Sequence, residues 1–247
     1  MSKVEDQKMK DTVASAQTSP SAGALPLRVE LLCEDRSGGL VLQRLTECIV
    51  RRHTKSYNCY LRPHRGCGYF SNQPEMKPQP YASGLCELLP AKLRAYDHVY
   101  AGTATIIVVC MDSDSNDPGE IFNKLRTICR TYGLGIRTVI AVSVEEMESW
   151  MLADQNALTM AYPEADLDIL KSYEQDSICG TWEVLCDVVL GEQSDRIKQI
   201  GYPAVGQYKA KWAEKISPYM LPEHNVSPSF KKFEVALDHA LQQVLAE

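Results

Sequence analysis

The stretch Thr105-Ile-Ile-Val-Val-Cys-Met-Asp-Ser-Asp-Ser-Asn-Asp117 decides the fold class. Its first seven residues are a continuous apolar run, which is typical of a strand buried on both faces of a sheet. Asp117, Pro118 and Glu120 then indicate the start of a helix, as the capping residue, the first-turn proline and the capping-box glutamate. A second apolar run follows at Arg137–Val144. A strand, a helix and a strand in this order predict a right-handed βαβ unit with parallel strands.

The residues upstream repeat this alternation. Arg28–Cys33 is a short apolar run that predicts a strand, and Leu40–Arg52 has apolar residues at helical spacing. The sequence therefore predicts an α/β fold, with a mostly parallel open sheet and helices on both faces.

The remaining segments set the expected domain organisation. Residues 1–26 are polar and without periodicity, which predicts a disordered tail. Residues 27–247 are expected to form one domain. Within it, 53–90 has many prolines and glycines and is interpreted as an irregular insertion, followed by a short helix near 83–95. Residues 155–247 are expected to be a helical C-terminal region.

Composition excludes several classes of protein. The chain has 247 residues, 45% of them hydrophobic, and a net charge of −6, so it is neither a disordered chain nor a basic nucleic-acid coat. Its nine cysteines form no CxxC pair, and we expect reduced thiols in the cytoplasm. No apolar run is long enough for a membrane span, so no membrane partner is expected.

Acidic residues follow each of the three predicted strands. Because the carboxyl ends of parallel strands share one edge of a sheet, these groups are expected to face one crevice. Carboxylates held close together repel one another unless a cation lies between them, and an all-oxygen cluster suits Mg²⁺ or Mn²⁺. The residues are Glu34 and Asp35, then Asp112 and Asp114, then Glu145, Glu146 and Glu148.

The acidic residues have alternative interpretations. A single acidic residue after a strand is most often a turn or cap residue, as expected for Asp117, and Glu145 alone would be a solvated helix start. An EF-hand loop would need glycine at Asp117 and glutamate at Asn123. A P-loop is excluded because the chain has no Gly-Lys dipeptide. A haloacid-dehalogenase-like phosphatase usually has threonine or valine where Asn116 stands.

Several motifs together resemble the Toprim domain of topoisomerases, primases and OLD-type nucleases. The chain is most similar to a Toprim-like family of bacterial proteins from defence islands, often encoded beside an AAA/ABC-type ATPase. The motifs are Cys33-Glu34-Asp35, Val109-Cys-Met-Asp112-Ser-Asp114, Glu146-Met-Glu148-Ser-Trp150-Met-Leu-Ala-Asp154, Lys211-Trp-Ala-Glu-Lys-Ile216 and Ser227-Pro-Ser-Phe-Lys-Lys-Phe233. The resemblance runs from about Leu27 to the C-terminus.

The resemblance implies a role for each of five carboxylates. Glu34 would be the general acid/base or a metal ligand. Asp112 and Asp114 would bind Mg²⁺ or Mn²⁺ and take part in phosphodiester chemistry, with Glu148 and Glu146 completing the site.

Several nucleases of this class also use a lysine. Lys209 and Lys211 are candidates, the alternative being an exposed, solubilising lysine.

A short basic stretch is a candidate nucleic-acid surface. Basic side chains neutralise phosphates and neighbouring tyrosines can stack on bases, although a solvated helix end has the same composition. The basic residues are Arg51, Arg52, Lys55, Arg62 and Arg65.

The carboxylate pattern and the resemblance together predict a Mg²⁺-dependent Toprim-like nuclease, and the resemblance implies that it acts in anti-phage defence together with an ATPase. The alternative is a non-catalytic partner or sensor subunit of an ATPase complex, and a weaker one is a phosphatase for a small substrate. The sequence leaves open DNA or RNA as the substrate, the activating signal and self-association.

Overall fold

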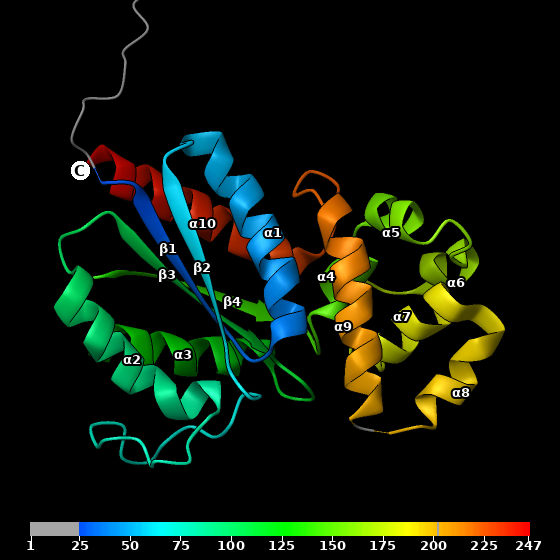
Figure 1. Ribbon diagram of the computed structural model, residues 1–247, viewed down its shortest axis with the longest axis horizontal. Helices are drawn as coiled ribbons and strands as arrows, with labels where there is room; N and C mark the ends of the chain where they lie inside the picture. Colours follow the sequence, from blue (N-terminus) through cyan, green and yellow to red (C-terminus); the bar gives the residue numbers. More distant parts are fainter. Residues whose placement is uncertain (1–24, 202) are drawn as a thin grey trace, which may run out of the picture.

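The computed structural model describes residues 25–201 and 203–247, which contain a four-stranded, all-parallel sheet with the strand order β2-β1-β3-β4 (Figure 1). β3 lies inside the sheet and is buried along nearly its whole length, as its continuous apolar sequence predicts. The strands are β1 (Leu27–Cys33), β2 (Tyr57–Pro63), β3 (Thr105–Asp112) and β4 (Arg137–Ser143).

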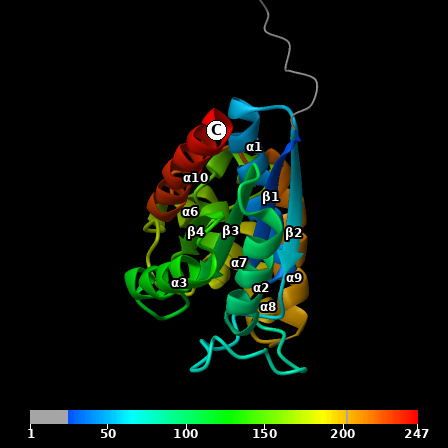
Figure 2. The ribbon, with the colours of Figure 1, turned by 90° about the vertical axis from the view of Figure 1, so that its left-hand side faces the viewer.

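Helices cover both faces of this sheet (Figure 2). One face packs against α1 (Arg36–His53) and α10 (Pro228–Ala246), and the other against α2 (Leu85–Tyr100) and α3 (Pro118–Tyr132). Alternate strand residues enter the two cores: Val108 lies in the first and Val109 in the second. The predicted α/β class with helices on both faces is therefore confirmed.

The C-terminal half adds a group of short helices beside the sheet, seen in green, yellow and orange in Figure 1. It carries the longer helix α9, which packs against α1 and α5 and brings residues 204–216 toward the sheet. The helices are α4 (Glu148–Leu152), α5 (Gln155–Ala161), α6 (Leu167–Ser172), α7 (Thr181–Leu190), α8 (Ser194–Lys198) and α9 (Ala204–Ile216), with 3₁₀ turns η1 (Gly191–Gln193) and η2 (Ser217–Tyr219).

The structure corrects the interpretation of residues 53–90 as irregular. This stretch contains β2, which pairs in parallel with β1 along its full length and forms one edge of the sheet. The alternation of apolar and polar residues in β2 is weak, because the strand is only partly buried and ends in Arg62 and Pro63. α1 also begins earlier than predicted, because Asp35 caps it by accepting a hydrogen bond from the Gly38 amide.

Two further expectations concern the ends of the chain and the membrane. Nearly all of the predicted tail, 1–26, lies outside the described residues. In the part of the chain that the structure describes, no helix combines the length and apolar character needed to cross a bilayer.

Trp150 joins the sheet region to α10 and should be a principal contributor to stability. It is fully buried, stacks on Phe233 with ring centroids 5.7 Å apart, and donates its indole N–H to Ser229 Oγ at 2.9 Å. We expect Trp150→Ala to lower the free energy of unfolding by about 3–5 kcal/mol in denaturant titrations. Val235→Ala, on the exposed side of α10, should change it by less than about 0.5 kcal/mol. Equal effects of the two changes would contradict this role.

Candidate functional site

The ends of β1 and β3 bring two of the predicted acidic groups into contact. Glu34 directly follows β1, and its Oε1 accepts a hydrogen bond of 3.0 Å from the main-chain N–H of Asp112, the last residue of β3. Asp112 in turn accepts a short hydrogen bond from Ser143 Oγ at the end of β4. The carboxyl ends of three neighbouring strands therefore meet at one edge, as the sequence predicts.

Two hydrogen bonds join the loops after β3 and β4. Asp114 N–H donates to the Glu145 carbonyl at 2.8 Å, and Glu145 N–H donates to Ser113 Oγ at 2.9 Å. Asp114 and Glu145 have φ values of 47° and 58°, in the left-handed region that residues other than glycine seldom adopt. Such backbone strain persists only where the surrounding structure imposes it, and it is common at functional sites.

The side chain of Glu145 provides that constraint. Its carboxylate accepts main-chain N–H hydrogen bonds from Cys179, Gly180 and Thr181, and another from the Thr181 hydroxyl, at the start of α7. Burial favours the neutral acid, but these hydrogen bonds outweigh it and lower the pKa of Glu145. Glu145 is therefore not the solvated helix-start residue considered from sequence; it fixes the two loops to the helical region.

Lys209 on α9 faces the remaining acidic group. Its Nζ lies 3.0 Å from Glu146 Oε1 and 3.2 Å from Glu148 Oε1. All three side chains are largely shielded from solvent, with exposed fractions of 11%, 17% and 4% for Lys209, Glu146 and Glu148. The expectation of an exposed, solubilising lysine is wrong for Lys209, whereas Lys211 is exposed.

Burial and mutual repulsion keep protons on this cluster at higher pH than usual. Burial, with the charges of Asp114 and Asp35, raises the pKa of Glu34 to about 7. Burial, followed by the charges of Glu34 and Glu148, raises the pKa of Asp112 well above its ordinary value. Because the second cause is like-charge repulsion, a cation placed among these groups would favour their ionised forms.

The positive charge of Lys209 lowers the pKa of every carboxylate in the predicted site. Its charge opposes the upward shifts that burial causes in all five. One ammonium group thus balances part of the charge of a cluster assembled from β1, β3 and the β4–α4 segment. The five carboxylates are Glu34, Asp112, Asp114, Glu146 and Glu148.

The five carboxylates are oxygen ligands of the kind that Mg²⁺ prefers, but they do not form a complete metal site. Within residues 25–201 and 203–247, no three Asp, Glu, His or Cys side chains have the spacing needed to hold one metal ion. Mg²⁺ often uses one or two carboxylates together with water and the phosphates of its substrate. Glu34 and Asp112, with oxygens on neighbouring strand ends, fit such a partial site.

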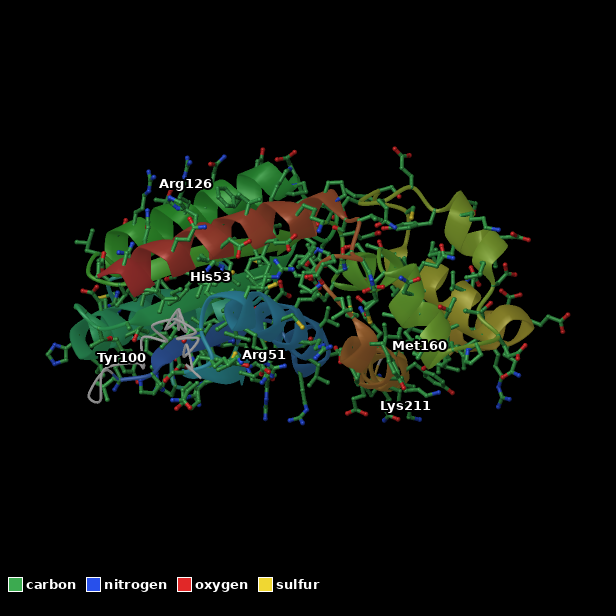
Figure 3. The ribbon with its side chains drawn as sticks, turned by 90° about the horizontal axis from the view of Figure 1, so that it is seen from above. Arg51, His53, Tyr100, Arg126, Met160 and Lys211 are labelled. Carbon is green, nitrogen blue, oxygen red and sulfur yellow. The ribbon has the colours of Figure 1, made fainter. Side chains whose placement is uncertain are left out.

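The predicted nucleic-acid residues fall at two ends of the molecule. Arg51 and Arg52, at the end of α1, lie with Lys55 at the opposite edge from the carboxylates; Figure 3 labels Arg51. Arg52 forms an ion pair of 2.6 Å with Glu223. Arg62, near the end of β2, and the exposed Arg65, just after it, lie on the carboxylate side, although Arg62 also binds the buried Glu30 at 2.8 Å.

Comparison of the chain with known protein families, with curated proteins and with solved structures gives no match. The site must therefore be judged from its own geometry.

In EDTA, the stability of the protein should depend on the protonation of Glu34. Its pKa is about 7 in the folded state and 4.5 ordinarily, so between these values the folded state binds more protons than the unfolded state. Its contribution to the free energy of unfolding should therefore fall as pH rises from about 4.5 to 7. Denaturant titrations across this range should show a shallower fall for Glu34→Gln than for the wild type.

The difference between the two profiles isolates Glu34 from other groups that titrate in this range, such as His64, whose pKa is lowered by burial. The exposed Glu164→Gln serves as a matched control and should follow the wild-type profile. Parallel profiles for Glu34→Gln and the wild type would contradict the assignment of Glu34 as a strained, buried acid.

Proposed function

We propose that the protein is a Toprim-like nuclease that hydrolyses phosphodiester bonds with Mg²⁺ or Mn²⁺. One observation carries this proposal: the buried ammonium group of Lys209 pairs with Glu146 and Glu148, and its charge lowers the pKa of all five carboxylates of the predicted site. The sequence resemblance to the Toprim domain supports the same conclusion, because its acidic motifs contribute all five.

The charge balance of the cluster favours a phosphate substrate brought in with a cation. Five carboxylates and one lysine leave an excess of negative charge whenever the acids ionise, and this would repel a nucleic acid. Glu34 and Asp112 would hold Mg²⁺, with Asp114 on the adjoining loop, and the substrate phosphate would supply the ligands that the incomplete protein site lacks. When bound, such an ion polarises the phosphoryl oxygen and lowers the pKa of a coordinated water.

The residues of the chain provide proton transfer and charge stabilisation. With a pKa of about 7, Glu34 can accept or donate a proton near neutral pH, which suits a general acid/base. Lys209 is held in place by Glu146 and Glu148, and its ammonium group would stabilise negative charge that develops on the phosphate. Arg62 and Arg65 lie on the same side and would contact the substrate backbone.

The biological setting is part of the proposal. By resemblance, the protein would be an effector of anti-phage defence in the bacterial cytoplasm and would act with an AAA/ABC-type ATPase subunit. The alternative, a non-catalytic sensor subunit, has one observation in its favour. Lys209 already pairs with Glu146 and Glu148, and the described residues contain no complete three-ligand metal site.

The direct test incubates the purified protein, with and without its cognate ATPase, with plasmid DNA, single-stranded DNA and tRNA. Cleavage in Mg²⁺ or Mn²⁺ that EDTA abolishes is expected. Intact substrates in every combination would favour the sensor subunit, and release of phosphate from only a small phosphomonoester would favour a phosphatase.

Asp112→Ala should abolish cleavage without unfolding the protein. Removing one of several repelling carboxylates should leave the melting temperature in EDTA unchanged or slightly raised, because like-charge repulsion is relieved. The shift of the melting temperature on adding Mg²⁺ or Mn²⁺ should disappear. The control is Asp168→Ala, whose carboxylate is 92% exposed on α6. If Asp112→Ala keeps both cleavage and the metal-dependent shift, the proposed function is wrong.

Lys209→Gln should show whether the lysine and a metal ion neutralise the same charges. Without the ammonium group, Glu146 and Glu148 are left buried without their cation, which is strongly unfavourable. We expect a lower melting temperature in EDTA, a larger stabilisation by Mg²⁺ than in the wild type, and loss of cleavage. Lys211→Gln, on the exposed side of α9, is the matched control. Identical behaviour of the two variants would exclude a role for Lys209 in the site.

A further inference from the structure

The free edge of β4 lies in a groove, away from the carboxylate cluster. β4 is the last strand of the sheet, and Figure 2 shows α10 and α3 on either side of it. Two adjoining hollows, of about 560 and 460 Å³, follow this edge and share Phe122, Ile140 and Ala236 in their walls. Together they form a continuous groove, here called the β4 groove, with β4 as its floor.

The main chain of β4 is available on this side. In the described part of the chain, β4 pairs with β3 alone, in register from Arg137 to Ser143. Among the same residues, no hydrogen bond joins the main chain of Thr138, Ile140 or Val142 to any group outside the sheet. An unprotected strand edge of this kind is a template for another extended segment.

The side chains beside this edge are apolar and incompletely covered. Ile140 and Val142 are only partly buried although they lie in the sheet, and Phe122 of α3 is 39% exposed. Phe233 and Ala236 of α10 complete the opposite wall. A strand added to β4 would bury Phe122, Ile140 and Val142 further, against alternate residues of its own.

The rim of the β4 groove is basic. Arg126 and Arg130 project from α3 with exposed side chains, and neither forms an ion pair within the described residues; Figure 3 labels Arg126. Lys232 on α10 is also exposed and lines the groove. The acidic residue in its wall, Asp176, already accepts hydrogen bonds from Ser227 and Ser229.

We infer that the β4 groove binds an extended segment of a partner protein in which acidic and apolar residues alternate, added to the sheet as a fifth strand. The open edge supplies main-chain hydrogen bonds, the apolar walls take alternate side chains, and the basic rim selects acidic ones. This inference does not depend on the proposed nuclease activity, because no residue of the groove belongs to the carboxylate cluster.

Two other occupants fit the groove less well. A second copy of the chain, paired through an antiparallel β4 edge, would place α3 beside the same helix of its partner, so that Arg126 and Arg130 of both copies repel each other. A nucleic acid would meet the basic rim but would leave the apolar floor and the strand edge without partners.

The test uses a fluorescein-labelled ten-residue peptide of alternating valine and glutamate, titrated against the full-length protein by fluorescence anisotropy. We expect saturable binding, at least tenfold weaker binding of a valine–lysine peptide, and slower hydrogen exchange in residues 137–143. A peptide of equal charge with prolines in place of the valines cannot add to a sheet and should not bind.

The variants locate the site. Ala236→Trp fills the groove and should weaken binding of the acidic peptide at least tenfold, as should the double change Arg126→Glu and Arg130→Glu. Val235→Trp, on the neighbouring exposed surface of α10, should bind as the wild type does. Circular dichroism melting curves check that each variant is folded.

Three results would overturn the inference. They are equal binding of the acidic and basic peptides, binding that Ala236→Trp leaves intact, and no saturable binding of the acidic peptide. Light scattering that shows a dimer dissociated by Ala236→Trp would assign the groove to a second copy. Displacement of the peptide by an oligonucleotide, with no exchange protection in β4, would assign the basic rim to a nucleic acid.

Discussion

The charge balance around Lys209 is the constraint on which the arrangement of the chain depends. Carboxylates from the ends of β1 and β3 and from the segment after β4 lie close enough to raise one another's pKa values, and burial strengthens that effect. A cluster of this kind is unstable without a nearby cation. The sheet and its covering helices do not provide one at this position, whereas α9 does.

The helical region between β4 and α10 can be understood as the support for that cation. α9 packs against α1 and α5, and Lys215 lies over the ring of Tyr162 with its Nζ 4.3 Å from the centroid. Glu145 ties the loops after β3 and β4 to the start of α7, in the same helical region. The packing of α9 thus holds Lys209 in the helical region, and the hydrogen bonds of Glu145 hold the acidic loops against the same region. A movement of either the loops or α9 would disturb the other.

The sequence predicts those features of the fold that depend on residues close together in the chain. The apolar run of β3 and the capping residues of α3 are enough to predict the βαβ unit, and the position of Glu34 and Asp112 at strand ends is enough to predict that they meet at one edge of the sheet. β2 was missed because an edge strand is only partly buried, so its apolar pattern is weak. Lys209 could not be assigned because its place depends on how α9 packs, 61 residues after Glu148 in the chain. A lysine in an amphipathic helix has the same sequence pattern whether it is exposed or buried.

The two edge strands of the sheet, β2 and β4, have different kinds of side chains beside them. At β2, the buried carboxylate of Glu30 binds both Arg28 and Arg62, and the guanidinium of Arg28 lies 4.1 Å from the ring centroid of Tyr60. These contacts join side chains of β1 and β2 into a set of ionic and aromatic groups that satisfy one another. At β4, Arg137 binds Gln243 and Glu247 at the start of the strand, and the rest of the strand lies between apolar walls with a basic rim. Both outer strands have an unpaired main-chain edge, but among the described residues β4 combines that edge with apolar walls and a basic rim, which makes the β4 groove the consistent place for a partner strand.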